Sequence, residues 1–205
     1  MKKIFAVLAA AALLLTALAS CRGDLVTLTY EDGQLVNKRA KLAYTPAPLN
    51  YEPASVGEEY AYYKKADMTL YEIVGLDPRE WLTEEYAGTA TTIFYGEGIT
   101  LPTLRGMDPD RFYLCISASR TISLATVEDA EIIAALLDLY ENGEQTEYPL
   151  ACSVANYELK FHSEEYPNLD YNLTLGVFPE GNFLYDRQSR RSVEIGSLLD
   201  AWIGS

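Results

Sequence analysis

Alternating apolar and polar positions run through most of the chain and predict short β-strands. Residues 25–30 alternate up to the sequence Glu31-Asp32-Gly33, a strong hairpin turn signal, and apolar residues resume at Leu35. The same kind of pattern predicts further strands at 59–63, 68–74, 91–95, 112–117, 157–162, 171–177, 183–185 and 193–195. The first half of the chain is therefore expected to be rich in β-structure, and an antiparallel sheet is expected near the C-terminus.

A helical period appears in one place with clear boundaries. Apolar side chains recur at Ile133, Leu136, Leu137 and Tyr140, after a capping sequence at 126–129 and before the stop signal Asn142-Gly143. Shorter helices are expected from Asp77-Pro78 to about Gly88 and at 198–203. Together these elements predict an α+β fold, in which one amphipathic helix and a short C-terminal helix pack on the antiparallel sheet.

The expected organisation is a leader at 1–20, a β-rich lobe at 21–105 and an α+β lobe at 106–205, or one continuous domain over 21–205. The order of elements lacks the strand–helix–strand alternation of nucleotide-binding folds.

The first 21 residues have the pattern of a signal peptide. Lys2 and Lys3 form a positive start, and Ile4–Ala19 is apolar apart from Thr16. This run is shorter than the roughly 20 residues that a membrane-spanning helix needs. The chain is therefore expected to be exported.

The sequence Leu18-Ala19-Ser20-Cys21 resembles the lipobox of bacterial lipoproteins, and the rest of the chain resembles uncharacterised small envelope lipoproteins. The resemblance implies cleavage just before Cys21, acylation of its sulfur, and anchoring on the extracytoplasmic face of the cell membrane. The folded body is expected close to the bilayer, because only Arg22-Gly23-Asp24 separates the anchor from the first strand.

The charge balance is strongly acidic. Sixteen Lys and Arg residues stand against 30 Asp and Glu, giving −14, and cleavage before Cys21 leaves 14 basic and 30 acidic residues and a charge of −16. Nucleic-acid binding is disfavoured, because it depends on basic residues that neutralise phosphates. Adsorption to an anionic bilayer is not expected either. A single histidine makes a classical metal-hydrolase site hard to build, and we expect no cofactor, no metal and no catalytic group.

Two cysteines remain after lipidation, Cys115 and Cys152. Outside the cytoplasm they can form a disulfide, which would close a loop around the predicted helix. The alternative is two unpaired thiols that pack as small apolar groups.

Arg187, Arg190 and Arg191 form a basic cluster in an otherwise acidic chain. Three guanidinium groups on a hairpin tip can hold an anion or an acidic partner, and the alternative is a solvated turn.

Tyrosines gather in the first half, and Tyr60, Tyr62 and Tyr63 occupy one predicted strand. Strand alternation places Tyr60 and Tyr62 on one face and Tyr63 on the other, so one set is a candidate partner-binding surface. The same alternation predicts that His162 points outward into solvent. In the sequence Asn168-x-Asp170-x-Asn172, turn chemistry explains the polar residues without calcium.

These features favour a membrane-anchored, extracytoplasmic lipoprotein that acts as a non-catalytic binding or accessory module for an envelope protein or a cell-wall polymer. Two alternatives remain open. An envelope hydrolase would need two carboxylates converging in a deep cleft. A small-molecule receptor for a transporter would need an enclosed apolar pocket between lobes.

Overall fold

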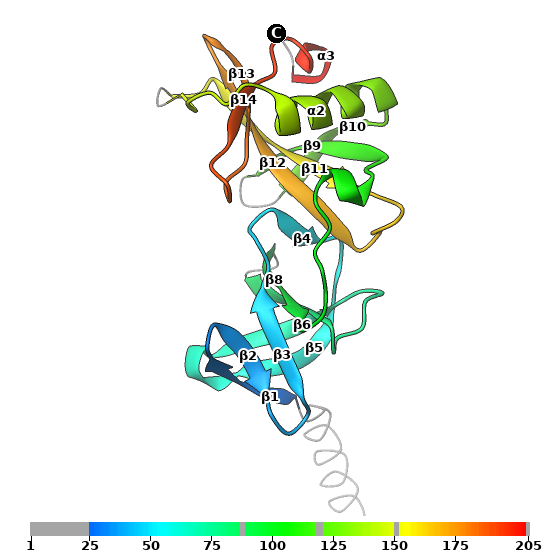
Figure 1. Cartoon of the computed structure of the whole chain (residues 1–205), viewed down its shortest axis with the longest axis vertical. Coiled ribbons are helices and arrows are strands. Elements are labelled where there is room, and N and C mark those ends of the chain that lie inside the picture. Colours follow the sequence, from blue (N-terminus) through cyan, green and yellow to red (C-terminus); the bar gives the residue numbers. More distant parts are fainter. Residues whose placement is uncertain (1–24, 87–88, 118–120, 150–151, 204–205) are drawn as a thin grey trace, which may run out of the picture.

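The computed structural model describes residues 25–86, 89–117, 121–149 and 152–203, which form two lobes along the long axis of the molecule (Figure 1). One lobe is a closed β-barrel and the other is an open sheet covered by a helix. Strands make up about half of the described residues. In the described residues the α-helices are α2 (Ala130–Asn142) and α3 (Asp200–Ile203). The prediction of an α+β fold is therefore wrong, and the protein is mostly β.

The barrel is built from seven strands of the first half of the chain. They follow the order β1-β2-β3-β8-β7-β6-β5, and a parallel pairing of β1 with β5 closes the ring. Their bounds are β1 (Val26–Glu31), β2 (Gln34–Asn37), β3 (Leu42–Pro46), β5 (Val56–Tyr63), β6 (Met68–Ile73), β7 (Trp81–Tyr86) and β8 (Thr89–Gly96). A short 3-10 helix, η1 (Lys64–Ala66), connects β5 to β6.

The predicted hairpin between β1 and β2 is confirmed. Asp32 and Gly33 both have positive φ, 49° and 88°, and Glu31 pairs directly with Gln34. A two-residue turn with both central residues at positive φ matches the twist of the flanking strands, which explains the Asp-Gly sequence.

The helix predicted from Asp77 is wrong, because the chain forms the strand β7 there. Asp77 does cap one turn: its Oδ1 accepts from the Arg79 N–H at 2.9 Å, and its carbonyl accepts from the Trp81 N–H at 2.9 Å. The backbone then extends, and β7 pairs with β6 on one side and β8 on the other. The backbone hydrogen bonds that β7 makes with β6 and β8 therefore outweigh the helix-capping tendency of Asp77.

The second lobe is an antiparallel sheet with the order β10-β9-β11-β12-β13-β14. Its strands are β9 (Arg111–Ser117), β10 (Thr121–Val127), β11 (Ala155–His162), β12 (Leu169–Phe178), β13 (Gly181–Tyr185) and β14 (Ser192–Glu194). The connection from the barrel carries a second 3-10 helix, η2 (Arg105–Met107). One strand from the first half of the chain, β4 (Tyr51–Pro53), is not part of the barrel. It pairs instead with the start of β12 in the second sheet.

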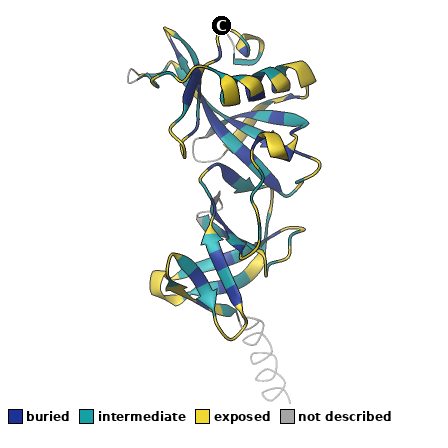
Figure 2. Ribbon diagram, in the orientation of Figure 1, coloured by how far each residue is buried: buried dark blue, intermediate teal, exposed yellow. Residues whose placement is uncertain are grey.

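Helix α2 packs on the face of the second sheet that is directed away from the barrel (Figure 1). Its start agrees with the prediction, because the Asp129 side chain accepts from the backbone N–H groups of Glu131 and Ile132. The predicted apolar stripe is also confirmed, since Ile133, Leu136 and Leu137 are buried. The outer surface of the helix is exposed, as Figure 2 shows.

The main hydrophobic core lies between α2 and the sheet and extends toward the barrel. It includes Phe112, Leu136 and Leu159 from the second lobe, and Ile73 and Ile93 from barrel strands. A smaller core fills the barrel: Leu28, Leu35, Leu42, Tyr44, Ala61, Leu70, Leu82 and Phe94. The predicted boundary at residues 105 and 106 falls in the connection between β8 and β9.

Candidate functional site

The face of the second sheet opposite α2 carries a row of titratable side chains. Along β11, Leu159 and Phe161 are buried in the core, so the alternate residues Glu158, Lys160 and His162 project from the other face. This polar face is the first place to look for chemistry, because sheltered titratable groups cluster at functional sites.

His162 is held by a carboxylate on the neighbouring strand. Its Nδ1 lies 2.8 Å from Asp170 Oδ1, and the two side chains are only 18% and 14% exposed. Burial raises the pKa of Asp170 above its ordinary value, although the hydrogen bond with His162 opposes this shift. The prediction of a solvated surface histidine is therefore wrong, because β12 supplies a partner that the sequence pattern of β11 does not reveal.

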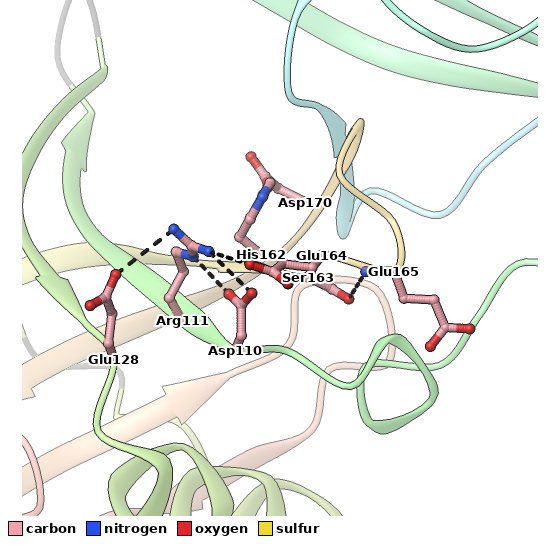
Figure 3. A network of polar contacts seen from close by, with 8 residues as sticks. All are labelled: Asp110, Arg111, Glu128, His162, Ser163, Glu164, Glu165 and Asp170. Atoms are coloured by element: carbon pink, nitrogen blue, oxygen red, sulfur yellow. Dashed lines mark hydrogen bonds and ion pairs between the residues drawn. The ribbon is translucent and has the colours of Figure 1, made fainter.

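A second network surrounds Arg111, beside His162 (Figure 3). The guanidinium donates to both carboxylate oxygens of Asp110, at 2.7 and 3.1 Å, and Glu128 and Glu164 lie at 3.8 and 3.7 Å. The pKa of Asp110 is held below its usual range by the hydrogen bond from Arg111. All three carboxylates lie around the same guanidinium, that of Arg111. Their role is therefore to hold the local structure together.

Lys160 and Glu52 form an ion pair that joins β11 to β4. Burial lowers the pKa of Lys160, but the Glu52 carboxylate outweighs it and leaves the pKa above its ordinary value. Farther along the row, Glu158 lies 3.7 Å from Arg187.

A small cavity opens beside these ion pairs, where the segment leaving the barrel meets the sheet. It has a volume of about 30 Å³, room for only one or two water molecules. Its lining residues are Leu49, Asn50, Glu52, Glu158, Asn172, Leu173, Thr174 and Arg187. Glu52 and Glu158 are two carboxylates in one cavity, as a hydrolase requires. The volume is far too small for a sugar unit, and a cation lies beside each carboxylate.

The three arginines of the predicted anion site do not converge. Arg187 Nε donates to Thr174 Oγ1 at 3.0 Å. Arg191 turns to the end of α2, where it donates to the carbonyls of Tyr140 and Gly143, both at 2.6 Å. A cation at a helix C-terminus is favoured by the helix dipole. Arg190 is exposed and adopts a positive φ of 58° in the turn. Two of the three thus have structural partners.

Asp186, which the sequence analysis did not single out, is the polar centre of this region. Its carboxylate accepts from Asn50 Nδ2 at 2.9 Å, from the Tyr140 hydroxyl at 2.7 Å and from Ser189 Oγ at 2.6 Å. Burial raises the pKa of Asp186, but the hydrogen bonds from Ser189, Tyr140 and Asn50 prevail and hold it below the ordinary value. Asp186 thereby links α2, the turn after β13 and the segment before β4. The sequence around Asp186 does not predict its contacts with α2 and with the segment before β4.

The tyrosines of β5 lie differently from the prediction. The β5–β6 register shifts between Glu59 and Ala61, so Tyr60 sits at an irregularity. Tyr60 and Tyr63 both pack against the barrel core. Tyr62 donates to Asp67 Oδ1 at 2.5 Å. The pairing of Tyr60 with Tyr62 on one face is therefore wrong, because simple alternation does not hold across the irregularity.

One member of this group, Tyr63, borders an open groove on the barrel. The groove has a volume of about 400 Å³ and lies between β1 and η1. Tyr30, 58% exposed, forms its outer wall, with its ring centroid 6.5 Å from that of Tyr63. Lys64 and Lys65 line the end of the groove at η1. Aromatic faces beside flexible cations can contact both apolar and anionic groups.

Cys115 lies beside the polar row of the second sheet, where it pairs with Glu158 across β9 and β11. Cys115 is a buried free thiol in β9, and Cys152 is an exposed free thiol before β11, so of the two possibilities the structure has the unpaired thiols. Burial raises the pKa of Cys115, which makes it a poor nucleophile. Cys21 and the leader lie outside the described residues.

Within the described residues, no group of three or more His, Cys, Asp or Glu side chains is placed to hold a metal ion. In the same part of the chain, no helix has the length and apolar character needed to cross a bilayer.

Comparisons with protein-family models, with curated proteins and with solved structures gave no match to this chain. A functional proposal therefore depends on the residues described above.

Proposed function

We propose that the protein is a lipid-anchored binding or accessory module on the extracytoplasmic face of the cell membrane. Its attachment point is Cys21, and the lipobox-like sequence before this residue supports the anchor. Its partner is an envelope protein or a cell-wall polymer, and the contact does not involve catalysis.

The groove between β1 and η1 carries the binding part of the proposal. It presents the exposed Tyr30 ring, the side chain of Tyr63 and two lysines in an opening of about 400 Å³. Tyrosine is enriched where protein partners bind, because it offers a large apolar face and a polar tip at a small entropic cost.

The position of the groove fits a partner at the membrane. β1 begins at Val26, so only the four residues 22–25 separate it from Cys21. Four extended residues span roughly 14 Å. A groove on β1 is therefore held near the bilayer surface, which favours an envelope protein over a distant wall polymer.

The polar face of the second sheet supports the non-catalytic interpretation. The carboxylates there are engaged by Lys160, Arg187, Arg111 and His162, and the cavity among them holds little more than water. We assign these groups to structure.

Site-specific photo-crosslinking in cells tests the groove. A photo-reactive phenylalanine analogue replaces Tyr30 in the full-length chain, and a matched control replaces the exposed Val74, 49% exposed on the loop after β6. We expect a discrete crosslinked species from position 30 and none from position 74. Equal labelling at both positions, or labelling at neither, would contradict a binding role for the groove.

A further inference from the structure

The first half of β10 is exposed on both of its faces. Thr121 to Leu124 are all exposed, and the two large apolar side chains, Ile122 and Leu124, are 52% and 50% accessible. β10 is also the end strand of its sheet, paired with β9 on one side. In the part of the chain that the structure describes, no strand pairs with its outer edge.

The opposite edge of the same sheet, at β14, is covered by another segment of the chain. At β14, Gln145 forms a β-bridge with Val193, and the Thr146 N–H donates to the Ser192 carbonyl at 2.9 Å. The segment after α2 thus covers the β14 edge. This contrast makes the β10 edge an unusual feature of this fold.

The sequence of β10 also lacks the residues that usually protect an edge. Its seven residues, Thr-Ile-Ser-Leu-Ala-Thr-Val, contain no charge and no proline. Exposed apolar edges without such residues pair readily with another strand. Leu124 is the extra residue of a bulge between Ser123 and Ala125, which shortens the regular part of the edge. Contact therefore depends on the Ile122 and Leu124 side chains as well as on the backbone.

We propose that the occupant of this edge is a second copy of the chain, whose β10 pairs antiparallel with the first across a two-fold axis. A strand that meets its own copy in this way forms a closed dimer, because both copies use the same surface. The two sheets then become one continuous sheet through the membrane-distal lobes.

Charge favours the antiparallel arrangement. The body is strongly acidic, but β10 itself is neutral, and the acids nearest to it in sequence are Glu128 and Asp129 at its C-terminal end. Antiparallel pairing places these acids of the two copies at opposite ends of the interface, roughly 24 Å apart for a seven-residue strand. This separation is about three Debye lengths at physiological ionic strength. A parallel arrangement would bring them together.

The shape of the molecule is compatible with two anchored copies. A two-fold axis perpendicular to the sheet keeps equivalent faces on the same side. Because α2 covers the face directed away from the barrel, both barrels of the dimer lie on the other side (Figure 1). Both β1 strands, and with them both Cys21 anchors, can then reach one membrane. This last step rests on the proposed lipid anchor, whereas the strand pairing does not.

The molar mass of the full-length chain tests the pairing. The protein is produced with its own leader, purified in mild detergent, and measured by light scattering across a dilution series. The test variant is I122K/L124K, which places charges on the edge, and the matched control is V154K, at a side chain that is 72% exposed on the segment before β11.

We expect the unsubstituted chain and V154K to form dimers, and I122K/L124K to weaken dimerisation by roughly tenfold or more. Circular dichroism should show the same fold for all three proteins, since all three substituted side chains are exposed. A monomer at every concentration would overturn the proposal, as would a dimer that the edge lysines leave unchanged. Failure of the lipid anchor would appear separately, in the mass of the N-terminal peptide.

Discussion

In the barrel every strand has a neighbour on both sides, whereas the second sheet ends in β10 on one side and β14 on the other. Among the residues whose burial the structure describes, the barrel has a small core of eight, because closure satisfies its backbone groups without further cover. The open sheet needs α2 on one face and a segment over one edge, and it still leaves β10 accessible. Surfaces for contact are expected at the groove between β1 and η1 and at the open β10 edge.

The largest predicted effect tests whether the two lobes unfold separately. Ile73 and Ile93 belong to barrel strands but pack in the main core, so the lobes should unfold together. Leu70→Ala in the barrel core and Leu136→Ala in α2 remove fully buried side chains. Each should lower the free energy of unfolding by about 2–5 kcal/mol.

Urea unfolding followed by tryptophan fluorescence measures this effect in two single-tryptophan backgrounds, one that keeps Trp81 in β7 and one that keeps Trp202 in α3. We expect a single transition at both tryptophans in each variant. Two separate transitions, with Leu70→Ala shifting only the one seen at Trp81, would show that the lobes are independent.

A smaller effect is expected at Asp186, the polar centre of the second lobe. Asp186→Asn removes the charge that three side-chain donors share, and should cost about 2 kcal/mol at neutral pH. Because the folded state lowers the pKa of Asp186, its stabilisation is present above the unfolded pKa, about 3.9, and is lost as pH falls through the folded value.

The free energy of unfolding measured between neutral pH and pH 2 checks the sign. The unsubstituted protein should lose more stability in the acid range than Asp186→Asn does. Parallel pH profiles for the two proteins would refute the role assigned to this carboxylate.

The smallest predicted effect separates two neighbouring arginines. Arg191→Ala removes a cation that donates to carbonyls at the end of α2 and should cost about 1 kcal/mol. Arg190→Ala, at an exposed side chain in the same turn, is the matched control and should change stability by less than about 0.5 kcal/mol. Thermal unfolding of both variants measures the two changes in stability. Equal losses for Arg191→Ala and Arg190→Ala would contradict a specific role for Arg191 at the end of α2.

Local patterns predicted most strands and the central helix, because turn residues, alternation and capping act over a few residues. The Asp-Gly hairpin and the Asp129 cap are examples. They failed at Asp77, where pairing with β6 and β8 overrode a helix start. Closure of the barrel by β1 and β5 has no local signature, because the residues that pair, such as Val26 and Ala61, are 35 positions apart in sequence.

The site was harder to predict than the fold, because its contacts join distant segments. Asp170 reaches His162, Asn50 reaches Asp186, and Arg191 reaches the end of α2. From the sequence pattern alone, these residues are expected at the surface or in turns. The irregularity beside Tyr60 likewise changed which tyrosines face the barrel core.

The proposed function depends most on attachment through Cys21, and the N-terminal peptide of the membrane-extracted protein tests this attachment directly. Mass spectrometry should find a peptide that begins at Cys21 and carries added acyl mass, and Cys21→Ser should abolish the addition and the processing. A chain recovered from the soluble fraction with residues 1–20 intact and no acyl mass would contradict the account.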